Sequence, residues 1–345
     1  MPDKRFKVSL AEKQLIGLSG LRVIGKSEGI FQPVPLDQRG DETICFFQVR
    51  NAAKLAEVLS EGFIDSAVIA HVSLEASIKP ALLAKFIKQN TLVLTANLTP
   101  KAIFSLLVEG QGPTDKGQLL LLSEPKSGAA NKNCQISANA TIAQSASIGE
   151  GSIVTSGAVI GDNVVVGKNC IIGESTMIYH DTILGDDVHI GPGSLIGSPV
   201  HANEQADIEA KFVDIPQIGT LRVGNNVRIG AQTVVNRGSL SDTVLGDHIR
   251  LGDRVNIGHN AHIGDRTWIA ASSIVCGSSK IGQNVSVGIG AVIKNKMKVG
   301  ENAMVGAGSV IISDVGANEN TYPVPALAEK ALLTLLRMIR KAGRR

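Results

Sequence analysis

VLGDHIRLGDRVNIGHNAHIGDRTWI, residues 244–269, places an aliphatic residue at every sixth position. The aliphatic residues are Leu245, Leu251, Ile257, Ile263 and Ile269, and a glycine follows the first four. A period of six matches neither an α-helix nor an ordinary amphipathic strand. It is typical of a hexapeptide β-helix, in which short parallel strands are joined by tight turns into a solenoid.

The six-residue period extends well beyond this stretch, in three runs separated by two breaks. The runs comprise Ile136, Ile142, Ile148, Val154, Ile160, Val166, Ile172, Ile178, Leu184, Ile190 and Ile196; then Val223, Ile229 and Val235; then Leu245 to Ile311. Three hexads are expected to close one triangular coil, so residues 18 apart should stack on neighbouring coils. With strands about 4.8 Å apart, the solenoid would be a prism about 40 Å long. A β-sandwich is the alternative, but its strands would not keep a common register over so many hexads.

The segments on either side of the solenoid lack this period. Residues 1–128 are predicted to form a small α/β domain, residues 129–318 the β-helix, and residues 319–345 a basic C-terminal helix. Within the first domain the predicted elements are helices at Ala52–Phe63 and Lys79–Asn90 and buried strands at Asp65–His71 and Thr91–Ala96. The polar run Glu124–Asn133 is a candidate linker.

Composition narrows the classes of function. The 345 residues carry a formal net charge of +3, which does not favour nucleic acid as a partner. The four cysteines form no CxxC pair, so neither a zinc motif nor a disulfide framework is expected. The sequence has no run of 18 apolar residues, so no membrane span is predicted. The first residues lack the apolar core of a signal peptide. A cytoplasmic protein without metal or cofactor is the simplest interpretation.

The C-terminal segment Pro325–Arg345 has apolar residues near helical spacing and ends in a basic cluster. Basic residues are favoured at the C-terminus of a helix, so packing on the solenoid or on another subunit would explain them. Docking of an acidic protein partner is a second interpretation that can coexist with the first. Adsorption to a membrane surface is less favoured for one short helix.

The two breaks in the period, Ser198–Leu221 and Asn236–Thr243, are where functional groups are expected. Loops that leave a rigid scaffold commonly carry binding and catalytic residues. The change of phase between Val235 and Leu245 indicates four extra residues that bulge from the prism.

Three motifs near these breaks resemble one enzyme family. IPQIG at 215–219, NRGSLSDT at 236–243 and IGHN at 257–260 are similar to those of UDP-3-O-(3-hydroxyacyl)glucosamine N-acyltransferases of lipid A biosynthesis. The resemblance is strongest over residues 215–290 and weaker at VSLAEKQ (8–14) and ETICFF (42–47). It implies a left-handed β-helix, an N-terminal uridine-binding domain and a C-terminal helix.

The resemblance assigns the catalytic base to His259, and the chemistry agrees. An amine that attacks a thioester must lose a proton, which a neutral imidazole can accept near pH 7. Gly277 lies 18 residues later, so it should stack beside His259, where its N–H could stabilise an oxyanion, as the matching family glycine does. Asp242, on the preceding coil, is expected to orient the imidazole or else to serve as a turn residue.

Substrate contacts are expected from Arg237 in the bulge, from Asn260 beside the base, and from Phe46 and Lys296. By the resemblance, Phe46 matches a phenylalanine that stacks on uracil. The chain also departs from the family pattern. The tyrosine that would complete the uracil site is Ala52, and Lys296 replaces the family's second histidine.

Three hypotheses follow. The first is transfer of a 3-hydroxyacyl chain from acyl carrier protein to the amine of a UDP-linked acylated glucosamine. The second is a coenzyme A-dependent acyl- or acetyltransferase for another nucleotide-linked amino sugar, which Ala52 and Lys296 would favour. The third is a non-catalytic scaffold or a metal site. The sequence has no histidine triad with suitable spacing, which argues against a metal site. A homotrimer with active sites between adjacent prisms is expected, and the basic helix would bind acyl carrier protein.

Overall fold

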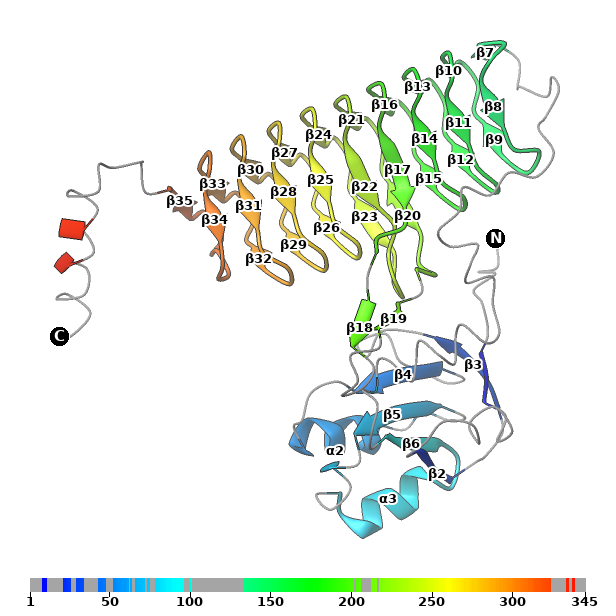
Figure 1. The fold of residues 1–345 in the computed structure, drawn as a ribbon, viewed down its shortest axis with the longest axis vertical. Coiled ribbons are helices and arrows are strands. Elements are labelled where there is room, and N and C mark those ends of the chain that lie inside the picture. The colour runs from blue at the N-terminus through cyan, green and yellow to red at the C-terminus, as the bar shows by residue number, and fades with distance from the viewer. Residues whose placement is uncertain are drawn as a thin grey trace.

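The computed structural model describes two folded parts and short pieces of the C-terminal segment. The described residues are 8–10, 21–25, 29–33, 43–47, 52–61, 63, 66–71, 73–74, 78–95, 100, 133–201, 203–205, 212–215, 217–323, 333–334 and 337–338. The larger part is a β-solenoid whose coils follow one another along its length (Figure 1).

Three parallel sheets form the faces of the solenoid. The first face contains β7 Gln135–Ile136, β10 Ile153–Val154, β13 Ile171–Ile172, β16 His189–Ile190, β21 Arg228–Ile229, β24 Arg250–Leu251, β27 Trp268–Ile269, β30 Ser286–Val287, β33 Met304–Val305 and β35 Asn320–Thr321. The second contains β8 Thr141–Ile142, β11 Val159–Ile160, β14 Met177–Ile178, β17 Leu195–Ser198, β22 Val234–Asn236, β25 Asn256–Ile257, β28 Ile274–Val275, β31 Val292–Ile293 and β34 Val310–Ile311. The third contains β9 Ser147–Ile148, β12 Val165–Val166, β15 Ile183–Leu184, β20 Leu221–Val223, β23 Thr243–Leu245, β26 His262–Ile263, β29 Lys280–Ile281 and β32 Lys298–Val299.

The stacking register confirms the expected coil of 18 residues. Val154 pairs with Ile172, and Ile257 pairs with Val275, each 18 positions later. At the first break Ile190 pairs with Ile229, 39 positions later, so this coil has 21 extra residues. At the second break Ile229 pairs with Leu251, 22 positions later, so the bulge has the expected four extra residues.

The aliphatic residue of each hexad points inward. These residues form one continuous core along the solenoid, and nearly all are less than one-tenth exposed. Ile136, at the open N-terminal end, is the exception at 36% exposed. The fold class is therefore confirmed as a parallel β-helix of hexapeptide turns.

Many turns place a residue other than glycine in the left-handed backbone region. Asparagine and aspartate do so as expected, for example Asn163 at φ 57° and Asp181 at φ 60°. Arg254 and Lys296 lie in the same region, at φ 56° and φ 65°, although residues of these types rarely do. The strong repetition of the coil geometry overrides the local preference at these positions.

The first break sends the chain out of the solenoid as a two-stranded antiparallel ribbon, formed by β18 Asn203–Gln205 and β19 Phe212–Asp214. In Figure 1 the ribbon leaves the middle of the solenoid on the side where the α/β part lies. The chain then returns through residues 217–220 to begin β20.

The N-terminal part is a six-stranded sheet in the order β1-β3-β4-β5-β6-β2. Its elements are β1 Val8–Leu10, β2 Leu21–Gly25, β3 Gly29–Pro33, β4 Thr43–Phe47, α2 Ala52–Ser60, β5 Ala67–His71, α3 Pro80–Phe86 and β6 Thr91–Thr95. Both predicted helices and both predicted strands are present with slightly shorter bounds. Leu55, Val58 and Phe86 of the helices belong to the same buried core as β5 and β6.

The predicted domain limits stay predictions, because residues 101–132 lie outside the described residues. Most of the predicted linker and most of the basic C-terminal helix also fall there. In that last segment residues 333–334 and 337–338 are helical. Arg337 lies in this helical part, whereas Arg340, Lys341, Arg344 and Arg345 are outside the described residues.

The inward register predicts opposite effects for two adjacent carboxylates. Ile257 is fully buried, whereas Asn256, its neighbour in β25, is exposed. Ile257→Asp would bury an unpaired carboxylate at a cost of several kcal/mol, so we expect insoluble protein or a Tm lower by about 10 °C or more. Asn256→Asp should melt within about 2 °C of the wild type by circular dichroism. Equal melting temperatures would show that the register is wrong.

Candidate active site

The corner between the second and third faces gathers the polar residues of both breaks. In each coil two turn residues follow the second-face strand, and together they form a line that we call the corner column. Its members include Asp162–Asn163, His180–Asp181, Arg237–Gly238, His259–Asn260 and Gly277–Ser278. The four-residue bulge, Gly238–Ser241, projects from this column directly beside His259.

His259 is half-buried, and its Nδ1 atom is engaged by two neighbours. Nδ1 lies 2.8 Å from Asn260 Oδ1 and 3.3 Å from Ser239 Oγ. The Asn260 amide is itself fixed, because its Nδ2 donates to the carbonyl oxygen of Ser241. Its Oδ1 accepts from the backbone N–H of Ser239 at 3.1 Å.

This network sets the tautomer of the imidazole. Asn260 Oδ1 is an acceptor, so the neutral His259 ring must carry its proton on Nδ1 and donate it there. Ser239 Oγ donates its single hydrogen to Gln217 Oε1 at 3.0 Å, so towards His259 it can only accept. Both contacts therefore leave Nε2 unprotonated, with a lone pair available to take a proton.

Nε2 faces the next coil at Gly277, as the stacking arithmetic predicted. A β-carbon placed on Gly277 would lie 2.6 Å from His259 Nε2, closer than van der Waals contact permits. Only glycine therefore leaves space beside this nitrogen. The carbonyl of Gly277 accepts from the N–H of Lys296, whereas its own N–H has no acceptor among the described residues. His259 Nε2 and Gly277 thus lie side by side, and the N–H of Gly277 is a candidate donor.

The structure corrects the role expected for Asp242. Its Oδ1 accepts from the N–H of Thr220 at 3.0 Å, and its Oδ2 is 2.7 Å from Arg222 Nε. Neither oxygen bonds His259 in the described structure. Asp242 therefore faces Thr220 and Arg222 at the start of β20. Asn260 and Ser239 contact the imidazole instead.

Arg237 is also not placed as expected. The side chain is only 3% exposed, so it cannot contact a substrate without leaving its site. It bonds the carbonyl oxygen of Gly219 and the ring of His180. Arg237, in the second break, thus bonds Gly219, in the first break, and links the two.

His180 occupies the same corner position as His259, three coils earlier. Its Nδ1 also bonds the following residue, with 2.6 Å to Asp181 Oδ2. Burial raises the pKa of Asp181, but the hydrogen bonds from His180 and Asn163 and the charge of Arg237 outweigh this and leave the pKa lowered. The Nε2 atom of His180 is covered by Arg237 at 2.6 Å, so of these two histidines only His259 has a free nitrogen. Sequence position alone cannot separate the two, because the covering arginine comes from another coil.

The remaining predicted site residues are spread more widely. Lys296 is exposed in the corner column, one coil beyond Gly277. Phe46 lies in β4 of the N-terminal sheet and is half-buried, and α2 begins at Ala52. The structure brings His259, Asn260 and Gly277 together, with Ser239 and Gln217 as partners that sequence analysis did not single out.

Two features of the described residues bear on other functions. No three side chains of His, Cys, Asp or Glu gather there as metal ligands. Within the same residues, none of the helices has the length and apolar character to cross a membrane.

Comparisons with known proteins agree with the repeat. The profile of bacterial transferase hexapeptide (six repeats) matches residues 163–198, and that of the hexapeptide repeat of succinyl-transferase matches residues 132–161 and 279–313. These matches lie at the two ends of the solenoid, whereas residues 199–278 and the N-terminal part lie outside them.

Curated relatives are named UDP-3-O-acylglucosamine N-acyltransferase. The protein of Bordetella pertussis is 40% identical over 74 residues, which are 21% of this chain and 20% of that protein. The protein of Shewanella denitrificans is 39% identical over 93 residues, 26% of each chain. The chain thus matches only about a fifth to a quarter of these relatives' length. A crystal structure of a UDP-N-acetylglucosamine acyltransferase from Bacteroides fragilis superposes with a TM-score of 0.49 and 25% identity, covering 59% of this chain and 78% of that one.

The assigned tautomer can be measured directly. We expect the ¹⁵N spectrum of histidine-labelled protein at pH 8 to show His259 protonated on Nδ1. Asn260→Ala removes the closer acceptor, so a fraction of the Nε2–H tautomer should appear. His262→Ala, on the exposed side of β26, should leave the His259 signals unchanged. A wild-type ring protonated on Nε2 would contradict the network described here.

Proposed function

We propose that the protein is an N-acyltransferase that moves an acyl chain from a thioester to the amine of a UDP-linked acylated glucosamine, as in lipid A biosynthesis. The observation that carries this proposal is the uncovered Nε2 of His259 beside the open N–H of Gly277. The names of the curated relatives supply the acceptor class.

The geometry suits aminolysis of a thioester. His259 Nε2 accepts a proton as the acceptor nitrogen forms a bond to the carbonyl carbon. The carbonyl oxygen gains negative charge, which the Gly277 N–H can stabilise. The intermediate then breaks the carbon–sulfur bond, and the imidazolium returns its proton to the departing thiolate. Asn260 Oδ1 stabilises the imidazolium by accepting from Nδ1–H throughout.

The donor side of the corner is basic. Lys280, Lys294, Lys296 and Lys298 are exposed on the coils that follow His259, and none has a carboxylate within ion-pair distance among the described residues. Such a surface suits a phosphate-bearing donor or an acidic protein. We assign the donor to acyl carrier protein, which the basic C-terminal segment would also contact.

Coenzyme A remains the alternative donor, with another nucleotide-linked amino sugar as acceptor. The residues that favour it are Ala52, where the family has a stacking tyrosine, and Lys296, where it has a histidine. A donor screen with purified protein separates the two. Turnover with acyl carrier protein thioesters at least about tenfold above coenzyme A thioesters is expected, and the reverse preference would establish the alternative.

A homotrimer is part of this proposal. The second face exposes a line of apolar side chains, including Met177 at 38%, Ile274 at 40% and Val310 at 64%. This face borders the corner column, so a second prism packed against it would complete a cleft over His259. We place the assembled enzyme in the cytoplasm, where acyl thioesters and nucleotide sugars occur.

Removing the base should abolish transfer without unfolding the protein. His259→Ala is expected to lower kcat by about a hundred- to ten-thousandfold, since it removes general base catalysis from a half-buried position outside the core. Raising the pH should partly restore activity, because more of the amine is then deprotonated. His262→Ala should retain near wild-type turnover. A folded His259→Ala protein with wild-type kcat would refute the assignment.

Gly277 should be equally sensitive to a single added methyl group. Gly277→Ala places a β-carbon 2.6 Å from Nε2, so the ring must move or the acyl group is excluded. We expect kcat/KM to fall by at least about a hundredfold, because the acyl carbonyl can then no longer reach the N–H of residue 277, with the melting temperature little changed. Ser278→Ala, on the adjacent turn residue, is the control and should remain active. Wild-type kcat/KM in Gly277→Ala would remove Gly277 from the site.

A further inference from the structure

The guanidinium of Arg237 is buried where the two breaks of the solenoid meet. Burial lowers its pKa to about 10, with the charges of Asp181 and Asp242 acting in the opposite direction, so the group remains a cation at neutral pH. A buried cation is costly unless hydrogen-bonded acceptors surround it. The acceptors around Arg237 therefore indicate what its burial achieves.

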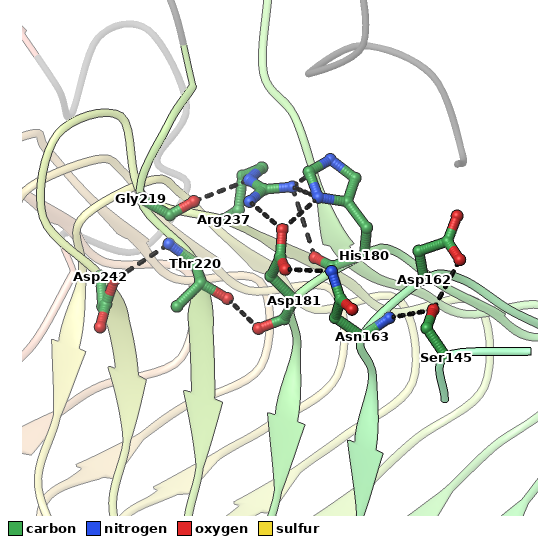
Figure 2. A network of polar contacts seen from close by, with 9 residues as sticks. All are labelled: Ser145, Asp162, Asn163, His180, Asp181, Gly219, Thr220, Arg237 and Asp242. Carbon is green, nitrogen blue, oxygen red and sulfur yellow. Dashed lines mark hydrogen bonds and ion pairs between the residues drawn. The ribbon is translucent and has the colours of Figure 1, made fainter. Parts of the chain in front are cut away.

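Those acceptors come from two parts of the chain (Figure 2). Arg237 Nε donates to the carbonyl oxygen of Gly219 at 2.7 Å. Its Nη1 lies 2.6 Å from His180 Nε2, and its Nη2 lies 4.0 Å from Asp181 Oδ2. His180 donates from Nδ1 to Asp181, so its Nε2 is free to accept from the arginine. The arginine thus links the return segment of the first break to an early coil.

A second contact joins the same two parts. Thr220 Oγ1 donates to the carbonyl oxygen of Asp181 (Figure 2). Asp181 is in turn held by Asn163, whose Nδ2 is 3.1 Å from Oδ1. The Arg237 side chain therefore holds Gly219 to the corner column, and the Thr220 side chain holds Thr220 to it.

The fastened segment leads directly to the base. The N–H groups of Ile218 and Gly219 both donate to the carbonyl oxygen of Ser239, at 2.7 and 2.9 Å. Ser239 Oγ donates to Gln217 Oε1 and also lies 3.3 Å from His259 Nδ1. The N–H of Ser239 also bonds Asn260 Oδ1, the acceptor that fixes the imidazole. Ser239 is consequently held from one side by residues 217–219 and contacts the His259–Asn260 pair on the other.

We propose that Arg237, His180 and Asp181 form a clamp that positions the general base through residues 217–220 and Ser239. Arg237 acts on the reaction through these residues and touches no reacting atom. The catalytic half of this inference rests on the proposed function, whereas the structural half does not. The same contacts explain why His180, the other histidine of the corner column, is covered: its Nε2 serves as an acceptor in the clamp.

Hydrogen exchange tests the structural half. Arg237→Met leaves Gly219 O and His180 Nε2 without their donor, so the amides of residues 218–220 should exchange at least about tenfold faster. Thr220→Val removes only the second contact and should give a smaller acceleration at the same amides. Arg228→Met removes an arginine of β21 on the first face, which bonds the carbonyl oxygens of Asp187 and Val227 among the described residues, and should leave these amides unchanged.

Kinetics tests the catalytic half. Arg237→Met and Ser239→Ala should each lower kcat by about tenfold or more, with KM for the sugar within about twofold of the wild type. Because both act along one path to His259, the double variant should be little worse than either single variant. A raised KM with unchanged kcat would mean that Arg237 binds substrate itself and would overturn the clamp, as would additive effects.

Wild-type exchange rates in Arg237→Met would overturn the proposal whatever the kinetics. If the wild type transfers no acyl group, the proposed function fails and the clamp is still decided. In that case accelerated exchange at residues 218–220, together with loss of the single Nδ1–H tautomer of His259 in Arg237→Met, supports it. Accelerated exchange with an unchanged His259 tautomer refutes it.

Discussion

Burial of one aliphatic side chain every six residues is the constraint on which the rest of the structure depends. Each coil is too thin to bury a core alone, so stability comes from stacking the inward residues of neighbouring coils. Ile257 lies on Val275, and Val275 on Ile293, without a change of register. Because the core tolerates no shift, extra residues can only leave at a corner. Both breaks therefore project from a rigid frame rather than distort it.

The rigid frame gives the candidate site its precision. Residues that are 17 to 22 positions apart in sequence become hydrogen-bonded neighbours, as with Asn260 and Ser239. The base, its orienting amide and the open N–H of Gly277 lie on two adjacent coils. The candidate site thus depends on the path of the two insertions. This path is where polar contacts replace the hydrophobic register as the organising interaction.

Sequence periodicity predicted the solenoid closely, because a hexad repeat permits one register. The position of Gly277 beside His259 followed from the same arithmetic. The orienting partner did not follow from it: Asp242 was expected to orient the imidazole or else to serve as a turn residue, but it bonds Arg222, and Asn260 bonds the imidazole. Arg237 was expected to bind substrate and is buried against His180. Such contacts depend on how an insertion folds back, which no residue spacing specifies.

The central claim is that His259 Nε2 is the atom that receives the proton of the acceptor amine. A crystal structure of the protein with an unreactive acyl thioester analogue and the UDP-linked acylated glucosamine would test it most directly. We predict the amine nitrogen within about 2.6–3.2 Å of His259 Nε2. The carbonyl oxygen should point to the N–H of Gly277. An amine bound beyond reach of His259, at another part of the corner column or in the N-terminal part, would contradict the claim.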